Sequence, residues 1–427
     1  MRALIKDKKI FAWAMYDWAN SAYTTTVMAG FFPVFFKNFW AHDLPATDSS
    51  FYLGLANSIA SLIVVLLAPI LGAIADRGSA KKRFLIFFAF MGAVMSGALV
   101  MAGRGEWELA VLIYILATLG YSGSVIFYDA LIVNVASHER MDKVSALGYA
   151  YGYLGGGLLF MVNVLMTLFP SAFGLADAAQ AVQVSFVTVA LWWAAFTVPL
   201  LLWVEEEKRA EKIGIIAATR AGFQQLSATF HELRQLRVVS LFLVGYWLYI
   251  DGVDTIVRMA VDYGLSLGFE QNSLIVALLI TQFVGFPAAI AFGYLGERIG
   301  TKPALYIAIS VYIMVCIYGY FLEAVYEFYI LAVVIGLVQG GVQSLSRSLY
   351  ARIIPKNKSA EFFGFFNMLG KFAAVIGPLL MGWVAVLTGS SRLSILSILV
   401  LFVLGLFFLS RVNEAEGVQA AKKLESL

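Results

Sequence analysis

Charged residues are scarce in this 427-residue sequence: they make up 13% of it, whereas a soluble globular chain carries roughly 25%. Hydrophobic residues make up 61%, and the mean hydropathy is +0.83. A water-soluble core of this size cannot enclose so many apolar side chains. The shortage of charge therefore excludes an ordinary soluble domain and predicts that lipid covers much of the surface.

Cysteine and histidine are nearly absent as well. The single cysteine, Cys316, lies in an apolar run, which excludes a disulfide within the chain and a thiolate metal site. The histidines His42, His138 and His231 lie in separate loops without metal-ligand spacing. We therefore expect no metal and no cofactor. The net charge of +3 is scattered over many short loops, which argues against nucleic acid as a partner.

What the sequence has in abundance is long apolar runs, and a membrane-spanning helix needs about 20 such residues. Alternating strands typical of a closed barrel are absent, so we predict an all-α membrane protein with twelve transmembrane helices. The first run contains Asp17 and Asn20 and lacks a cleavage site, which favours a retained helix over a signal peptide. The predicted spans are 11–38, 52–75, 84–102, 107–135, 144–169, 184–204, 238–262, 270–295, 303–322, 327–351, 361–386 and 391–410.

The positive charges predict the orientation of these spans. With the N-terminus in the cytoplasm, 24 of the 30 Lys and Arg residues fall in inner segments and 3 in outer ones. This bias predicts that both termini are cytoplasmic, in a multi-pass protein of the plasma (bacterial inner) membrane.

The chain divides into two halves of six spans each. We predict an N-terminal six-helix bundle at 1–204, a C-terminal six-helix bundle at 238–410 and a cytoplasmic tail at 411–427. The linker 205–237 carries apolar residues at steps of three or four from Phe223 onward, which predicts an amphipathic helix on the inner membrane surface. The first helices of the two halves match, since Trp13-x3-Asp17-x2-Asn20 parallels Trp247-x3-Asp251-x2-Asp254. This similarity predicts two pseudo-repeats.

A short motif occurs once in each half, after the second helix. Both copies resemble the Gly-x3-Asp/Glu-Arg signature of the major facilitator superfamily, and the resemblance implies that fold. An acid at the cytoplasmic end of a helix gains from a nearby cation or helix N-terminus in one state of a transporter, which suggests a cytoplasmic gate. The residues are Gly72, Asp76 and Arg77 in the first copy, and Gly293, Glu297 and Arg298 in the second.

A narrower resemblance extends over nearly the whole chain. The stretch from Trp13 to Tyr23 is similar to the opening helix of the autophagy-related vacuolar effluxer family and its bacterial relatives. The stretches 152–156, 343–348 and 370–378 fit the same family. Fungal members are associated with release of amino acids from the vacuole, so the resemblance implies a transporter. We expect it to be a monomer whose partners are a small-molecule cargo, protons and the lipid bilayer.

Charges inside the predicted spans are the main candidates for function, because each costs ~2.5–3.5 kcal/mol at the centre of a membrane helix. In one reading, the cations and acids bind a zwitterionic cargo such as an amino acid. In a second reading, Asp129 or Asp251 carries a coupling proton. In a third, the charges pair with each other as locks between the halves, Asp129 with Arg347 for example. The residues are Asp17, with Asn20 beside it, Asp129, Asp251, Asp254, Arg258, Arg347 and Lys371.

Aromatic residues surround these acids in the sequence. Such rings can clamp a cargo or a cation in a cavity, although they more often pack or form interfacial belts. The candidates for a cavity are Tyr16, Trp18, Tyr23, Trp247 and Tyr249.

The missing motifs narrow the class of function. The sequence has no ATP-binding loop, no His-Glu-x2-His and no nucleophile elbow, so we expect neither an ATP-driven pump nor an enzyme. We predict a secondary active transporter of a small polar solute, best an amino acid, coupled to protons. The alternatives are a lipid or amphiphile translocator, an uncoupled facilitator and a non-transporting membrane receptor.

Overall fold

The structure, a computed structural model, describes residues 2–44, 46–78, 80–206 and 236–425. Each of the twelve predicted spans lies on helical backbone to within two residues. The prediction of an all-α membrane protein is therefore confirmed. The amphipathic helix predicted in the linker lies almost entirely outside the described residues.

The first half of the chain begins with a span whose winding changes along its length. Its α-helical start passes at Tyr23 into wider π-helical turns, designated η1 and η2, and the remaining spans of this half are α-helices joined by short 3-10 turns. The elements are α1 (Arg2–Lys6), α2 (Lys8–Ala22), η1 (Tyr23–Phe31), α3 (Phe32–Phe35), η2 (Phe36–Trp40), α4 (Ala46–Gly78), α5 (Lys81–Ala98), η3 (Leu99–Met101), α6 (Trp107–Val135), η4 (His138–Arg140), α7 (Met141–Leu168), η5 (Pro170–Phe173) and α8 (Ala178–Trp203).

The second half has six spans and one further helix. Its last span is divided at Ile398, and Pro287 and Pro378 lie inside α11 and α14. The elements are α10 (Arg237–Ser266), α11 (Gln271–Ile299), α12 (Thr301–Tyr320), α13 (Val325–Ile353), η6 (Lys356–Lys358), α14 (Ser359–Thr388), α15 (Ser391–Ser397), α16 (Leu399–Ser410) and α17 (Glu414–Glu425).

Nine helical segments of the described chain are long and apolar enough to cross a membrane. The first predicted span is not among them: its winding changes at Tyr23, and the segment around that change contains Asp17, Asn20 and three threonines. α4 and α14 contribute the shorter apolar stretches Leu62–Asp76 and Ile376–Thr388.

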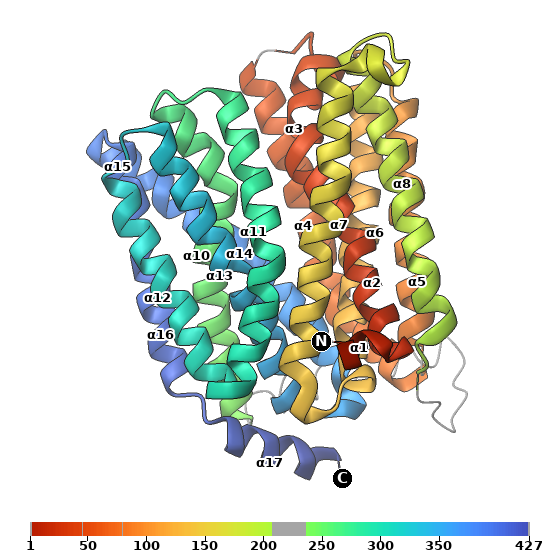
Figure 1. The fold of residues 1–427 in the computed structure, drawn as a ribbon, viewed down its shortest axis with the longest axis vertical. Helices are drawn as coiled ribbons and strands as arrows, with labels where there is room; N and C mark the ends of the chain where they lie inside the picture. Colours follow the sequence, from red (N-terminus) through yellow and green to blue (C-terminus); the bar gives the residue numbers. More distant parts are fainter. Residues whose placement is uncertain (1, 45, 79, 207–235, 426–427) are drawn as a thin grey trace.

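The helices gather in two bundles, α2–α8 and α10–α16, as Figure 1 shows. α7 packs along α11 and α4 packs along α14, so these two pairs of helices form the seam between the bundles. Both ends of the described chain lie toward one end of the molecule, at the bottom of Figure 1. We call this end, where α4 ends and α14 begins, the terminal side, and the other end the distal side.

Polar contacts join the bundles only over part of this seam. Between residues that the structure describes on both sides, hydrogen bonds and ion pairs run from the terminal side as far as Thr25 and Gln282. Gln282 lies near the middle of α11. The described contacts therefore hold the bundles together on the terminal side.

The predicted polar tail contains a helix. α17 follows the last span and packs against the terminal end of α13, where Gly417 lies against Ile353 and Val238. Glu414 pairs with Arg352 at 3.1 Å, and Ala421 is buried. The tail is thus attached to the helix that carries Arg347.

Candidate functional site

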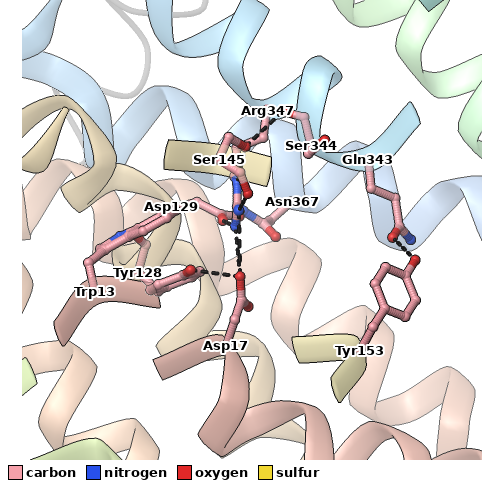
Figure 2. Close-up of polar contacts among 10 residues, drawn as sticks. All are labelled: Trp13, Asp17, Tyr128, Asp129, Ser145, Tyr153, Gln343, Ser344, Arg347 and Asn367. Atoms are coloured by element: carbon pink, nitrogen blue, oxygen red, sulfur yellow. Dashed lines mark hydrogen bonds and ion pairs between the residues drawn. The ribbon is translucent and has the colours of Figure 1, made fainter. Parts of the chain in front are cut away.

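Arg347 is a charged residue near the terminal end of α13, and its side chain is only 1% exposed. Its Nη1 lies 3.1 Å from Asp129 Oδ1 on α6 and 3.4 Å from Asp17 Oδ2 on α2. Figure 2 shows the guanidinium between these carboxylates. One cation from the second bundle therefore binds two acids from the first.

α7 completes the shell of Arg347. The guanidinium donates from Nε to the hydroxyl of Ser145 at 2.9 Å and from Nη2 to the Ser145 carbonyl at 2.8 Å. Tyr149, one turn further along α7, places its ring 4.2 Å from the guanidinium carbon. Trp13 and Tyr128 lie at 4.8 and 5.3 Å. Aromatic faces and hydrogen-bond acceptors thus replace the water that a guanidinium requires.

The two acids have further partners that fix their orientation. Tyr128 donates to Asp17 Oδ2 at 2.7 Å, and Trp13 stacks on the Tyr128 ring with centroids 4.4 Å apart. Asn367 on α14 donates to Asp129 Oδ2 at 3.1 Å. Asp129 therefore contacts two helices of the opposite bundle, α13 through Arg347 and α14 through Asn367.

Gly148 makes room for this cluster. A Cβ at this position would lie 2.7 Å from Asp17 Oδ2, 2.7 Å from the Tyr128 hydroxyl and 3.0 Å from Arg347 Nη2. Real carbon atoms do not approach that closely, so any larger residue would displace the charged groups. The position of the charges depends on this glycine in α7.

The charges of the described cluster do not balance. Two carboxylates, Asp17 and Asp129, meet one guanidinium, and all three side chains are buried. An uncompensated charge costs several kcal/mol in a medium of low polarity. The cluster is therefore suited to accept one further positive charge, either a proton or a cationic group.

A second polar contact lies one helical turn toward the distal side. Gln343 precedes Arg347 by four residues on α13 and accepts a hydrogen bond from the Tyr153 hydroxyl at 2.9 Å (Figure 2). Tyr153 lies on α7, one turn beyond Tyr149. Residues four apart share a helix face, so a polar strip continues from Arg347 toward the distal side.

The first copy of the loop motif lies at the terminal seam. Asp76 pairs with Lys81 at 2.9 Å, and it accepts a hydrogen bond at 2.8 Å from the backbone N–H of Glu361, in the first turn of α14. Lys81 also donates to Ser359 across the seam at 2.8 Å. Gly72 allows the approach, since a Cβ there would lie 2.3 Å from the Ala360 carbonyl oxygen. An anion at a helix N-terminus is favourable, so this contact stabilises the closed seam.

The second copy makes a different contact. Glu297 pairs with Lys143 on α7, while Arg298 is exposed to solvent. The buried acid at this seam is Asp142, which accepts hydrogen bonds from Thr301 and pairs with Arg352 at 3.0 Å. A Cβ on Gly293 would lie 2.6 Å from the Ala146 Cβ on α7, so α11 and α7 also approach closely.

Comparison with known proteins decides the family. The family described as "Vacuole effluxer Atg22 like" matches residues 43–140 and 133–422. The chain belongs to this family. The uncharacterized MFS-type transporter YxiO of Bacillus subtilis (strain 168) is 39% identical over 418 residues, which cover 97% of each chain. Autophagy-related protein 22 of Yarrowia lipolytica (strain CLIB 122 / E 150) is 23% identical and covers 87% of this chain and 77% of its own.

The solved structures show the fold of this Atg22-like chain. The proton:xylose symporter XylE superposes with a TM-score of 0.74 at 15% identity, covering 97% of this chain and 99% of that one. The human organic anion transporter MFSD10 gives a TM-score of 0.73, also at 15% identity, with 94% and 99% covered. The predicted major facilitator fold and the resemblance to the Atg22 family are both confirmed, and the chain is a membrane transporter of this superfamily.

The structure brings only part of the predicted site of the Atg22-like chain together. Asp17, Asp129 and Arg347 meet, whereas Asp251 and Asp254 lie on α10 within the second bundle. Asn20 is buried with its side-chain nitrogen unpaired. The side chains of Arg77, Arg258 and Lys371 lie outside the described part of the structure.

The predicted cavity aromatics pack mainly within their own bundles, and their contact with a cargo stays a prediction. Tyr23 donates to or accepts from Thr118 at 2.8 Å inside the first bundle, and Tyr249 pairs with Ser346 inside the second. Trp18 stacks on Trp192 of α8 with centroids 5.5 Å apart. Tyr16 is buried against Tyr128, behind the cluster, and Trp247 is half-buried on α10.

The rings that do touch Arg347 were not predicted. Trp13 and Tyr128 are neighbours in sequence of the predicted acids, one turn before Asp17 and directly before Asp129. That adjacency was the available signal. For Tyr149 and Asn367 the sequence holds no such signal. Their contacts with Arg347 and Asp129 depend on how α7 packs against the second bundle and α14 against the first.

Proposed function

We propose that this chain is a secondary transporter that moves a small zwitterionic solute, best an amino acid, by alternating access coupled to protons. The observation that carries the proposal is Arg347, a buried cation of one bundle bound by Asp17 and Asp129 of the other. The family description, a vacuole effluxer, supports movement of a solute across a membrane.

The cluster contains a partner for each charged group of a zwitterion, a cation for its carboxylate and an acid for its ammonium group. The carboxylate of an amino acid would replace Asp129 on the Arg347 guanidinium, and its ammonium group would bind the released carboxylate. Each charge exchanges one ionic partner for another, so the exchange costs less than exposing either charge alone. Breaking the link between α13 and α6 would free the bundles to move apart, which makes the ion pair a switch.

The coupling proton belongs on Asp129 in this proposal. The described charged and titratable groups around it are Asp17, Arg347, Tyr121, Tyr128, Tyr149 and Tyr246. Together with Asp129 itself, they give two carboxylates to one cation. A proton on Asp129 would neutralise that excess and weaken its hold on Arg347. Proton binding and opening of the seam would then be linked.

Transport by the purified chain in liposomes tests both parts. An imposed pH gradient should drive the accumulation of labelled amino acids, and exchange with unlabelled amino acid inside should need no gradient. The Asp129→Asn variant should lose gradient-driven uptake by at least tenfold and keep exchange. Unchanged gradient dependence in this variant would exclude Asp129 as the proton carrier, and exchange of no amino acid would exclude the cargo class.

A second candidate, translocation of an amphiphile, has one observation in its favour. A cavity within the second bundle is lined almost wholly by apolar side chains, among them Ile256, Phe328 and Met381. An acyl chain or a large apolar group would fit such a surface. Movement of fluorescent lipid between leaflets of the same liposomes would favour this candidate over the amino acid.

We also propose the orientation in the membrane. Both termini would be cytoplasmic, with the terminal side facing inward, because the positive charges favour that arrangement. The similar protein of a bacterium supports the bacterial plasma membrane as the location.

A further inference from the structure

Asp251 is a further buried acid, and it lies outside both the Arg347 cluster and the terminal seam. It sits on α10 and is 1% exposed. Its Oδ1 accepts hydrogen bonds from the backbone N–H of Gly377 at 2.9 Å and from the Thr255 hydroxyl at 3.3 Å. Its Oδ2 is buried and has no hydrogen-bond partner. Such an oxygen would be strongly unfavourable if it carried charge.

The surroundings of Asp251 supply no described compensating cation. Asp254, one turn further along α10, bears the same sign. α16 has no charged residue, and Arg347 on α13 is held by Asp17 and Asp129. On α14, Glu361 lies beside Asp76, and the side chain of Lys371 is outside the described part.

Gly377, the partner of Asp251 on α14, directly precedes Pro378, where the backbone hydrogen bonding of that helix is interrupted. Pro378 has no N–H to donate, and its ring crowds the carbonyl of Ala374. Gly377 leaves no space for a side chain, since a Cβ would lie 1.8 Å from Thr255 Oγ1. A proline inside a helix, as Pro378 is in α14, allows the helix to bend there. Asp251 is therefore bonded to the site where α14 can bend.

The segments of α14 before and after Gly377 and Pro378 make different contacts. On the terminal side, Glu361 and Asn367 bind Asp76 and Asp129 of the first bundle. On the distal side, Met381 lines the apolar cavity inside the second bundle. A bend at Gly377 would therefore move the gate segment of α14 relative to its own bundle.

We propose that Asp251 is a proton-binding site that controls whether α14 bends at Gly377 and Pro378. The proton comes from water, adds to Oδ2 and converts the carboxylate into a neutral acid that the dry bundle tolerates. Oδ1 keeps the hydrogen bond from Gly377. When the proton returns to water, the charged carboxylate requires hydration, and α14 bends to admit it. The coupling of this step to cargo rests on the proposed transport cycle, whereas the proton site does not.

Infrared spectroscopy of the purified full chain in lipid tests the site without any cargo. The wild type at neutral pH should show the carbonyl band of a protonated carboxylic acid. Asp251→Asn should lower this band, Asp251→Glu should shift it, and Asp254→Asn, one turn away, should leave it in place. A spectrum of Asp251→Asn equal to that of the wild type would overturn the site, as would loss of the band in Asp254→Asn.

Distance measurements test the control of α14. Spin labels at the exposed positions Glu139 and Arg298, in a Cys316→Ser background, report the separation of the bundles on the terminal side. In an Asp129→Asn background, which removes the proton site proposed at the seam, the separation should widen as the pH rises and should stay fixed once Asp251→Asn is added. A pH-dependent separation retained in the Asp129→Asn, Asp251→Asn double variant would overturn the control of α14. A negative amino-acid transport assay would leave both results unaffected, since neither experiment contains cargo.

Discussion

Arg347 has more ionic and hydrogen-bond partners in the opposite bundle than a stabilising ion pair needs. Two carboxylates, a hydroxyl and a carbonyl accept from its guanidinium. A buried ion pair is often no more stable than apolar residues of the same size, so stability alone does not explain the arrangement. A charged pair that can be exchanged for cargo does explain it.

Removing the guanidinium should destabilise the protein, because Asp17 and Asp129 would lose their cation. We expect Arg347→Gln to lower the free energy of unfolding by ~3–5 kcal/mol, measured by thermal unfolding in detergent. Replacing all three charges together, as Arg347→Met, Asp17→Asn and Asp129→Asn, should recover most of that loss but not transport. A wild-type melting temperature in Arg347→Gln would contradict the buried pair.

Gly148 offers a separate test at the level of one methyl group. Gly148→Ala should displace the charged groups and reduce transport at least tenfold, because its Cβ would lie 2.7 Å from Asp17 Oδ2. Gly382→Ala in α14 is the matched control, since no atom lies within 4 Å of a Cβ there. In a helix this control should be neutral or stabilising by up to ~1 kcal/mol. Equal transport by both variants would argue against the tight fit at Gly148.

Among the helices, α13 and α17 form a connected pair. Arg352 at the end of α13 contacts Asp142 of the first bundle and Glu414 of α17 at the same time. Lys356 donates its backbone N–H to Glu425, at the other end of α17, at 2.6 Å. The tail helix is therefore bonded to the residues that close the seam.

The contact of α17 can be tested with a pair of neighbouring acids. Glu414→Gln should increase hydrogen exchange in 414–425 and lower the free energy of unfolding by ~1 kcal/mol or less, since Glu414 is partly exposed. Glu416 makes no described side-chain contact, so Glu416→Gln serves as the control. The same exchange rates in both variants would mean that the Arg352 pair does not hold the tail.

For the molecule as a whole, the distribution of positive charge predicts the orientation. A fluorescent reporter fused to the C-terminus should be active in the cytoplasm, and a periplasmic phosphatase fused there should be inactive. The same pair of reporters placed after Arg104, in the loop between α5 and α6, should give the opposite result. Reversed activities would contradict the predicted orientation.

Much of this architecture could be predicted from the sequence, because membrane helices depend on local composition. The apolar runs gave the spans, and the motifs at Asp76 and Glu297 suggested the superfamily. The charges Asp17, Asp129 and Arg347 were found because charge in a span is expensive. The fold prediction reached its limit at Tyr23, where the winding of the first span changes, because an apolar run predicts a helix and not its number of residues per turn.

The remainder of the site depends on packing between distant segments. Asn367 meets Asp129 across 238 positions of sequence, and Ser145 meets Arg347 across 202. No local pattern encodes such pairs. Tyr16 and Tyr23 likewise pack inside the first bundle, on faces of α2 and η1 that no local pattern marks. The tail helix was missed because it is mainly polar and only a few apolar residues, among them Val418 and Leu424, pack against the core.

The bond between Tyr153 and Gln343 has a mechanical consequence. Along α7, Tyr153 lies ~16 Å from the seam contact at Asp142 and ~22 Å from the distal end at Leu168. Tyr153 thus lies near the middle of α7, at a point about which the two parts of the helix could tilt. A tilt of about 15° about this point would displace the shorter arm by roughly 4 Å at this geometry, more than the length of any hydrogen bond there. A rotation of this size would therefore break the contacts of Asp142 with Thr301 and Arg352, where α7 meets the second bundle on the terminal side.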